Sequence, residues 1–513
     1  MMREAAIERL LDEIKKGKVE RRGYQLWIIS SIIKARRYNR NVLIELDAGM
    51  GKRIITYLVS RIFRDDKILI ITPSRVSVWD TVMTFRELSG GDSWFGAIVG
   101  GMPKGLKIAN LRKRVTITTP ISLARLIEKH PELVSDVEVV IINEIDKVLR
   151  RICLRPASNI DYEHAGHGEY VGILSYPWNI LKTYLPQTAC WIGMSGTLRD
   201  EHYLYATDGV RVKKELETLL EVLYPKKNTV IITMDTIIER TDAREYIVRN
   251  LTLIRPIPVE DENVRILVDA ISREMSYVIE NIRDYSREIY PEESTPFETK
   301  EKIIRTISVL PHNNPLKIKF LRLALARRHI FANTPQVYRR FLSKPMFRRI
   351  IRKYHEVELD EIIPKESAKL RKIVEICSEW LATNQKANIV ILTSFVKTAI
   401  EIWKKLKDIP ADTYILTGRT FNKKAIIEKF KRKKPSILIL TPVAERDLDF
   451  PQASLVIIHD VISTTKSMYQ RIKRARRSLV LILYYKDTFE EKKVNILLSR
   501  ILRRYPWSIR VLT

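Results

Sequence analysis

The 513-residue chain has only three cysteines, Cys153, Cys190 and Cys377, and they lie far apart in the sequence. Their spacing fits neither a disulfide framework nor a cysteine metal site. No apolar run reaches the roughly 18 residues that a membrane-spanning helix needs. The first residues alternate charged and apolar side chains and lack the apolar centre of a secretory signal. We therefore expect an intracellular protein, cytoplasmic or associated with the nucleoid, with no membrane partner.

Acidic residues are few relative to basic ones. The chain has 61 Asp and Glu against 90 Lys and Arg, a formal net charge of +29. Such an excess attracts polyanions, of which nucleic acid is the commonest in a cell. A solvated basic surface is the alternative that charge alone leaves open. The length exceeds what one hydrophobic core accommodates, so we expect two or three domains.

Short β-branched runs alternate with amphipathic helical stretches, from about residue 24 to 197 and again from about residue 367 to the end. Apolar runs separated by helices are typical of parallel strands buried on both faces. Between these regions, residues 262–355 have helical periodicity, and the later part of this segment is strongly basic. The predicted fold class is therefore α/β, with two parallel-sheet domains and a helical insertion between them. The expected strands are residues 41–46, 67–72, 115–119, 137–143, 190–195, 388–394, 413–417, 436–441, 454–459 and 478–485.

Residues 46–53 read LDAGMGKR and lie between an expected strand and an expected helix. Gly49 and Gly51 allow a tight turn around Met50, so that backbone N–H groups converge on phosphate oxygens. Lys52 can reach the outer phosphates, and the start of the helix favours their negative charge. This setting predicts a nucleotide phosphate site, with an ordinary turn as the alternative.

Asn143, Glu144, Ile145 and Asp146 stand at the end of another expected strand. In ATP-driven motors one carboxylate at this point holds Mg²⁺ and the next polarises the attacking water. Glu144 suits the second role, whereas Asn143 does not suit the first. Taken by itself, the segment is equally compatible with a strand followed by a polar turn.

Taken in order, these segments resemble the motifs of superfamily 2 helicases, most closely the archaeal Hef helicase and its relatives, over about residues 20–490. Residues 46–53 resemble motif I, residues 143–146 motif II and residues 193–197 motif III. Residues 21–25 resemble the adenine-reading segment. Residues 71–82 resemble motif Ia, residues 116–120 motif Ib, residues 391–399 motif IV, residues 440–451 motif V and residues 469–477 motif VI.

The resemblance implies two RecA-like lobes. Residues 1–245 would form the first lobe, residues 246–260 with 359–513 the second, and residues 261–358 the helical insertion. It also implies a helicase or translocase that binds ATP between the lobes and nucleic acid across them. DNA is expected in preference to RNA, with a repair or nuclease protein as a further partner.

The resemblance assigns roles to individual residues. Catalysis is assigned to Lys52, Glu144, Gln470, Arg474 and Arg477. Nucleotide binding is assigned to Tyr24, which would stack on the base, and to Gln25, Gly49, Met50, Gly51, Lys52, Arg53, Asp449 and Arg471. Nucleic-acid binding is assigned to Thr72, Pro73, Arg75, Thr119, Pro120, Thr393 and Ser394. The basic insertion, with Arg348 and Arg349, would extend this track as a clamp or else be a solvated face. Trp79 is expected to pack in a core or between the lobes, with stacking on a base as the alternative.

The sequence departs from the family at the Mg²⁺ site. Arg53 stands where the family has a hydroxyl residue, and Asn143 where it has a carboxylate; Asp447 and Lys473 replace glycines of motifs V and VI. Because Mg²⁺ needs oxygen ligands in near-octahedral order, its binding should weaken. Asn143 removes one negative charge and Arg53 adds one positive charge, so the site becomes more positive by two, the charge of the ion. We therefore expect ATP as the cofactor, with Arg53 against the phosphates, little need for Mg²⁺ and no protein metal site. Drift towards a pseudo-helicase that binds nucleic acid without turnover is the second hypothesis.

Overall fold

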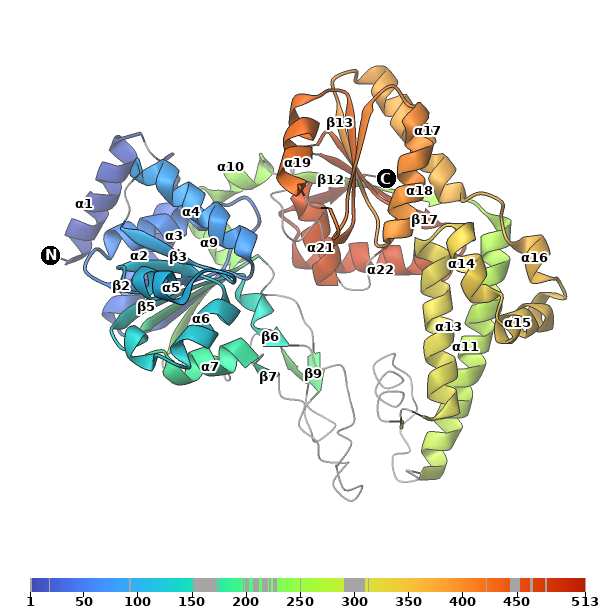
Figure 1. The fold of residues 1–513 in the computed structure, drawn as a ribbon, viewed down its shortest axis with the longest axis horizontal. Coiled ribbons are helices and arrows are strands. Elements are labelled where there is room, and N and C mark those ends of the chain that lie inside the picture. Colours follow the sequence, from blue (N-terminus) through green and yellow to red (C-terminus); the bar gives the residue numbers. More distant parts are fainter. Residues whose placement is uncertain are drawn as a thin grey trace. The chain divides into compact units, whose positions relative to one another are not determined.

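The computed structural model describes residues 2–17, 19–91, 94–150, 173–174, 176–196, 198, 203–205, 212–214, 220, 223–224, 228–249, 251–289, 310–311, 313–420, 422–442, 453–461, 465–475 and 478–512. The chain divides into two compact units (Figure 1). Unit 1 comprises Met1–Cys153 and Asp161–Asn250, and unit 2 comprises Leu154–Ile160 and Leu251–Thr513. Within the described parts, every helix is too short or too polar to cross a membrane.

Unit 1 contains a parallel sheet of seven strands in the order β11, β1, β8, β5, β2, β4 and β3. Five strands confirm the expected positions: β1 (Asn41–Glu45), β2 (Lys67–Ile71), β4 (Val115–Thr118), β5 (Val137–Asn143) and β8 (Cys190–Ser195). The edge strands β3 (Phe95–Ile98) and β11 (Thr229–Ile232) were not expected. Each has only four residues and one neighbouring strand, so neither produces a long apolar run.

Helices connect these strands. They are α1 (Met2–Lys15), α2 (Gly23–Arg37), α3 (Lys52–Ile62), α4 (Arg75–Ser89), α5 (Lys104–Leu111), α6 (Pro120–Ile127), α7 (Tyr176–Tyr184), α9 (Met234–Arg240) and α10 (Ala243–Val248), with the short 3₁₀ helices η1 (Pro131–Val134) and η2 (Ile145–Lys147). Two antiparallel pairs complete the described part: β6 (Leu149–Arg150) with β7 (Ile173–Leu174), and β9 (Tyr203–Tyr205) with β10 (Val212–Lys214).

Unit 2 contains a second parallel sheet of seven strands, in the order β14, β15, β13, β16, β17, β12 and β18. The strands are β12 (Thr252–Val259), β13 (Asn388–Leu392), β14 (Asp412–Leu416), β15 (Ser436–Leu440), β16 (Leu455–Ile458), β17 (Leu479–Tyr485) and β18 (Ile509–Val511). Strand β12 pairs with β17 although the insertion separates them in sequence. This pairing confirms that the sheet begins before the insertion; the short edge strand β18 was not expected.

The helical insertion shares a core with the second sheet. It consists of α11 (Glu262–Ile289), α13 (Pro315–Ala332), α14 (Pro335–Leu342), α15 (Pro345–His355) and α16 (Leu359–Ile362), and α11 and α13 lie side by side (Figure 1). Leu323 and Phe347 of the insertion belong to the same apolar cluster as Ile389 and Ile391 of β13. The insertion is therefore anchored on one face of the sheet.

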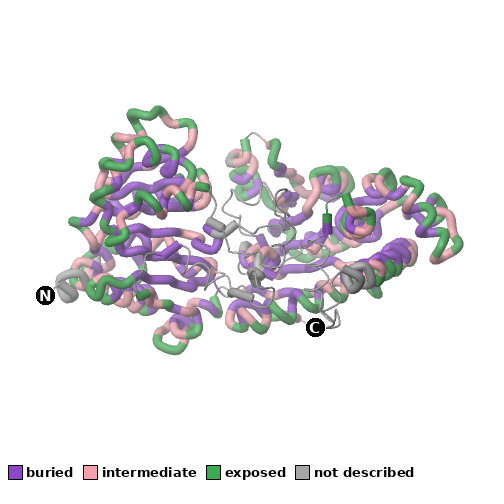
Figure 2. Tube along the Cα trace, turned by 90° about the horizontal axis from the view of Figure 1, so that it is seen from below, coloured by how far each residue is buried: buried purple, intermediate pink, exposed green. Residues whose placement is uncertain are grey.

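The other face of that sheet has its own core. Alternate residues of β13, Val390 and Leu392, join a second cluster with α19 (Lys423–Arg432), α21 (Thr465–Arg474) and α22 (Phe489–Arg504). Helices α17 (Ala368–Thr383) and α18 (Val396–Lys405) pack on the insertion side, and the 3₁₀ helix η4 (Leu406–Asp408) follows α18. Figure 2 shows the buried residues of each unit gathered in its interior. The sheets are thus buried on both faces, as their apolar runs predict.

A buried lysine joins the insertion to the second sheet. Lys369 in α17 is 0% exposed, and its Nζ donates to the carbonyl oxygens of Phe331 at 3.2 Å and His459 at 3.1 Å. The same ammonium lies 2.8 Å from the carboxylate of Glu490. Because a buried carboxylate without a partner is costly, this pair must remain intact for unit 2 to be stable.

We predict that Lys369→Ala destabilises unit 2 by about 3–5 kcal/mol, because it leaves the buried Glu490 carboxylate unpaired. Urea denaturation followed by circular dichroism measures the change. Lys372→Ala is the control: this lysine lies one turn along α17 and pairs with Glu375 at the surface, so it should change stability by about 1 kcal/mol or less. Equal effects of the two substitutions would contradict the prediction.

Candidate nucleotide site

The loop from residue 46 to 51 connects β1 to α3 at the carboxyl edge of the first sheet. Gly49 and Gly51 have φ angles of 90° and 78°, in the left-handed region that favours glycine. The backbone N–H of Met50 donates to the carbonyl oxygen of Asp47 at 3.3 Å, which closes the turn. No side chain caps the start of α3. The N–H groups of its first turn can therefore bind an anion.

The loop has no room for a side chain at Gly51. A Cβ there would lie 2.4 Å from Nε2 of Gln25. That Nε2 donates to the carbonyl oxygen of Met50 at 3.2 Å, and the hydroxyl of Tyr24 donates to the same oxygen at 2.9 Å. The expected adenine-reading segment thus holds the phosphate loop in place.

Tyr24 lies in the interior of unit 1. Its ring is 0% exposed and packs edge-on against Tyr246, with 5.3 Å between the ring centroids. Asp242 accepts hydrogen bonds from the backbone N–H groups of Gly23 and Tyr24 at 2.9 and 2.7 Å, which fixes the start of α2. The ring is therefore buried within unit 1, and its expected stacking on a base stays a prediction.

Lys52 lies where motifs I, II and III meet. Its Nζ donates to the carbonyl oxygen of Leu46 at 3.0 Å and lies 3.6 Å from Oε1 of Glu144. A Cβ at Gly196 would be 3.5 Å from the same Nζ. The lysine is only partly buried, at 18% exposure. An incoming phosphate can therefore replace the carbonyl oxygen as its partner.

Glu144 adopts an unusual backbone conformation. Its φ of 59° is uncommon for a residue other than glycine, and such strain often occurs at functional sites. The side chain is 29% exposed, between Lys52 and Lys147. Two residues later, the buried Asp146 accepts a hydrogen bond from the Ser195 hydroxyl at 2.5 Å.

Asp146 and Ser195 connect motif II to motif III, and the residue assignments from sequence did not include either. Asp146 lies within the motif II segment and Ser195 within the motif III segment. The sequence therefore showed both motifs but not that they meet. The parallel pairing of β5 with β8 brings the ends of the two motifs together.

Arg53 does not point along the loop. Its Nη2 lies 2.9 Å from Oδ2 of Asp80 in α4, and the two side chains are 37% and 27% exposed. Without a nucleotide, Arg53 thus pairs with Asp80, and its expected position against the phosphates stays a prediction. The guanidinium instead pairs with the neighbouring helix because a carboxylate is available there.

The strand-backbone segments of the first sheet do come together. Thr72 and Thr119 follow the paired strands β2 and β4. Both threonines are buried, and the Thr119 hydroxyl donates to Ser122 at 2.9 Å. These hydroxyls are thus used within the fold, and the expected contacts of both residues with nucleic acid stay predictions. Pro73 and Pro120 beside them are partly exposed.

The first turns of α4 present an exposed stripe. Arg75 is exposed, as the sequence predicted for a phosphate contact. Trp79 and Met83 follow at spacings of four residues and are 40% and 53% exposed. Trp79 is therefore not a core residue of unit 1. Packing in a core was one of the two packing roles expected for it, and packing between the lobes was the other.

In unit 2, the motif IV residues lie beside a buried aspartate. Thr393 is 0% exposed, and its expected contact with nucleic acid stays a prediction. Ser394 is partly exposed, and its backbone N–H donates to Oδ1 of Asp460 at 2.7 Å. Although burial opposes ionisation, the neighbouring His459 imidazole and the positive charge of Arg471 hold the pKa of Asp460 well below its ordinary value.

Arg471 lies inside unit 2. It is 1% exposed, and Nη1 donates to the carbonyl oxygen of Asp460 at 3.3 Å. The guanidinium is thus buried in unit 2, and its expected role in nucleotide binding stays a prediction. Gln470, before it in α21, is partly exposed. Of Arg474 only the helix position is described, and Arg477, Asp447 and Asp449 lie outside the described residues.

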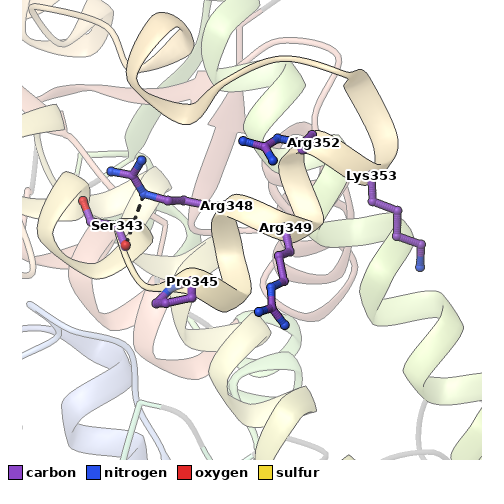
Figure 3. A pocket seen from close by; sticks show the side chains of 6 residues that line it. All are labelled: Ser343, Pro345, Arg348, Arg349, Arg352 and Lys353. Atoms are coloured by element: carbon purple, nitrogen blue, oxygen red, sulfur yellow. Dashed lines mark hydrogen bonds between the residues drawn. The ribbon is translucent and has the colours of Figure 1, made fainter.

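The insertion carries a basic pocket of about 530 Å³ at the start of α15 (Figure 3). It is lined by Ser343, Pro345, Arg348, Arg349, Arg352 and Lys353. Arg348 pairs with Asp360 at 3.1 Å and Lys353 with Glu274 at 3.0 Å, while Arg352 pairs with Glu358. Arg349 is exposed and has no acidic partner among the described residues. The predicted basic face is thus exposed and partly neutralised.

Two families match separate parts of the chain. Residues 23–159 match the DEAD/DEAH box helicase family, and residues 368–478 match the helicase conserved C-terminal domain. The first match covers the phosphate loop and the motif II segment, and the second covers the motif IV segment and the whole of α21.

Similar segments occur in curated helicases. The probable ATP-dependent RNA helicase Dbp45A of Drosophila melanogaster is 31% identical over 108 residues, which are 21% of this chain and 21% of that protein. The pre-mRNA-splicing ATP-dependent RNA helicase prp28 of Schizosaccharomyces pombe is 29% identical over 148 residues, 27% of this chain and 22% of the relative. The chain thus matches about a fifth of the length of these relatives.

Solved structures share the fold over most of the chain. The Hef helicase domain of Pyrococcus furiosus has a TM-score of 0.58 at 17% identity, and the match covers 94% of this chain and 98% of the other. Dbp5 of S. cerevisiae, bound to RNA and ADP BeF3, has a TM-score of 0.53 at 14% identity, with 98% and 92% covered. At these identities the likeness shows the fold alone: two RecA-like lobes, as expected.

We predict that Gly51→Ala weakens ATP binding by at least about tenfold, because the left-handed φ and the contact with Gln25 both disfavour a side chain. Isothermal titration calorimetry measures the affinity. Gly105→Ala in α5 is the matched control, since a Cβ there meets nothing within 4 Å. Unchanged ATP affinity in the Gly51 variant would show that the loop does not bind the phosphates.

Proposed function

We propose that the chain binds ATP at residues 46–53 and acts on nucleic acid as a helicase or translocase, because two of its segments match the DEAD/DEAH box helicase family and the helicase conserved C-terminal domain. The observation that carries this proposal is the position of Lys52, beside the motif I loop, Glu144 and Gly196. A phosphate-binding lysine next to a motif II carboxylate is the arrangement that ATP hydrolysis requires.

Different residues of the first unit would bind ATP and hydrolyse it. The N–H groups at the start of α3 bind phosphate oxygens, and Lys52 moves from the carbonyl oxygen of Leu46 to the outer phosphates. Glu144 orients and polarises the attacking water. Asp146, fixed by Ser195, keeps the motif II turn in place. From the second lobe, Arg474 and Arg477 would stabilise the charge that develops on the γ-phosphate, as the resemblance implies.

Mg²⁺ does not fit this set of residues well. Asn143 offers a neutral amide, whose Oδ1 is buried without a hydrogen-bond partner among the described residues. Arg53 is a cation paired with Asp80. Among the described residues, no group of three or more His, Cys, Asp and Glu side chains can hold a metal ion. We therefore propose that ATP binds with little dependence on Mg²⁺ and is hydrolysed slowly, or that the protein is a pseudo-helicase that clamps nucleic acid.

Nucleic acid would lie along the exposed positive side chains. Arg75 of α4 contacts the phosphate backbone, with Trp79 available for stacking one turn later. Arg348 and Arg349 of the insertion extend the track as a clamp. The motif resemblance favours DNA and a partner in repair, such as a nuclease, whereas the curated relatives are named RNA helicases. Competition between DNA and RNA for the protein decides the substrate.

We predict that Lys52→Ala weakens ATP binding by at least about tenfold, because it removes the cation that binds the outer phosphates. Glu144→Gln should keep binding but lower hydrolysis by about 100-fold, because the general base is lost. Phosphate release is measured with and without single-stranded, duplex and forked DNA and with RNA. Lys129→Ala, at an exposed lysine after α6, serves as the control.

Two results would separate the hypotheses. Phosphate release that nucleic acid stimulates, and that both variants abolish, supports the motor. Tight binding of nucleic acid and nucleotide without any release supports the pseudo-helicase. Hydrolysis that survives in Lys52→Ala would place the ATP site elsewhere.

We further predict that the wild-type protein binds ATP in EDTA within about tenfold of its affinity in Mg²⁺, because the positive charge of Arg53 compensates for the ion. A titration with a non-hydrolysable ATP analogue in the two buffers measures the ratio. A strict requirement for Mg²⁺ would contradict the proposal.

A further inference from the structure

The start of α3 concentrates positive charge. Lys52 and Arg53 are adjacent in its first turn, which contains no acidic residue. The amino end of a helix is itself the positive end of the helix dipole, so two cations there need compensation. Each has a carboxylate from another element: Glu144 lies 3.6 Å from Lys52, and Asp80 lies 2.9 Å from Arg53.

Asp80 is placed to form an ion pair with Arg53 that is weak enough to be exchanged. It lies in the second turn of α4, and α4 packs beside α3. The arginine is 37% exposed and the aspartate 27% exposed, so solvent reaches both groups. Ion pairs with this exposure contribute little to stability. Exchanging the aspartate for another anion therefore costs little.

A phosphate chain is a stronger partner for Arg53 than one carboxylate. It carries several negative charges, and a guanidinium binds phosphate oxygens through paired hydrogen bonds. Arg53 follows directly after the lysine that the proposed function places on the outer phosphates. Arg53 itself occupies the position where the family has its metal-binding hydroxyl.

We propose that Asp80 is the resting partner of Arg53, which the phosphates of a metal-free nucleotide displace. In the absence of nucleotide, Asp80 holds the Arg53 guanidinium beside the phosphate loop. When a nucleoside triphosphate binds, the guanidinium leaves Asp80 for the phosphate oxygens and supplies positive charge that Mg²⁺ would otherwise supply. This inference rests on the proposed nucleotide site and identifies its ligand as a metal-free nucleoside triphosphate.

Three variants and one control test the role. Arg53→Thr restores the hydroxyl of the family, Asp80→Asn removes the competing charge at nearly constant size, and the double variant combines both. Asp136→Asn is the matched control, because Asp136 pairs with Lys67 at 2.6 Å in the same unit, at the start of β2 rather than at the phosphate loop. Thermal denaturation by circular dichroism verifies that each variant is folded. The affinity for a non-hydrolysable ATP analogue is measured in EDTA and in Mg²⁺.

We expect Arg53→Thr to raise the Kd in EDTA by about tenfold or more, because a charge-assisted hydrogen bond is lost, and to increase the dependence on Mg²⁺. Asp80→Asn should lower the Kd in EDTA by about two- to fivefold, the scale of an exposed ion pair, because Arg53 no longer has a competing partner. In the Arg53→Thr background the same change should have no effect. Asp136→Asn should leave every Kd unchanged.

Other outcomes would overturn the role of Asp80. An equal effect of Asp80→Asn in both backgrounds would mean direct repulsion of the phosphates rather than an effect through Arg53. An unchanged ratio of the Kd values in EDTA and Mg²⁺ for Arg53→Thr would remove Arg53 as the substitute for the metal. If the wild-type protein binds no nucleotide in either buffer, the nucleotide site itself fails. If it binds while all variants behave like the control, only the inference about Asp80 fails.

Discussion

Burial of parallel strands on both faces is the constraint on which the rest of the structure depends. Strands that are apolar along their length pack between helix layers, and parallel pairing places all their carboxyl ends at one edge of the sheet. In unit 1 this edge carries the phosphate loop after β1, the turn at Glu144 after β5 and Gly196 after β8. The meeting of Lys52 with Glu144 follows from this order, because β8 lies between β1 and β5.

The same principle explains what could be predicted from the sequence. The central strands are continuous apolar runs, so their positions, the parallel pairing and the insertion after β12 could all be inferred. The edge strands β3, β11 and β18 could not, because each has only three or four residues. The phosphate loop was recognisable because its two glycines and Lys52 have a fixed spacing.

The directions of individual side chains were much harder to predict. Tyr24 is turned inward by Tyr246 and by Asp242, a residue 218 positions away. Arg471 bonds Asp460 inside unit 2, although its position in motif VI resembles that of residues that bind nucleotide. Arg53 pairs with Asp80 of another helix. In each case the partner lies on another element. Motif spacing therefore predicts the region in which a residue lies, whereas tertiary packing determines the direction of its polar group.

The central claim is that ATP binds at the carboxyl edge of the first sheet, and hydrogen–deuterium exchange with and without ATP tests it most directly. We expect slower exchange of the backbone amides in residues 47–54 and 143–147 when ATP is present. Amides at the opposite edge, at residues 112–114 and 135–137, should exchange at unchanged rates. Absence of protection in residues 47–54, or protection confined to another part of the chain, would contradict the claim.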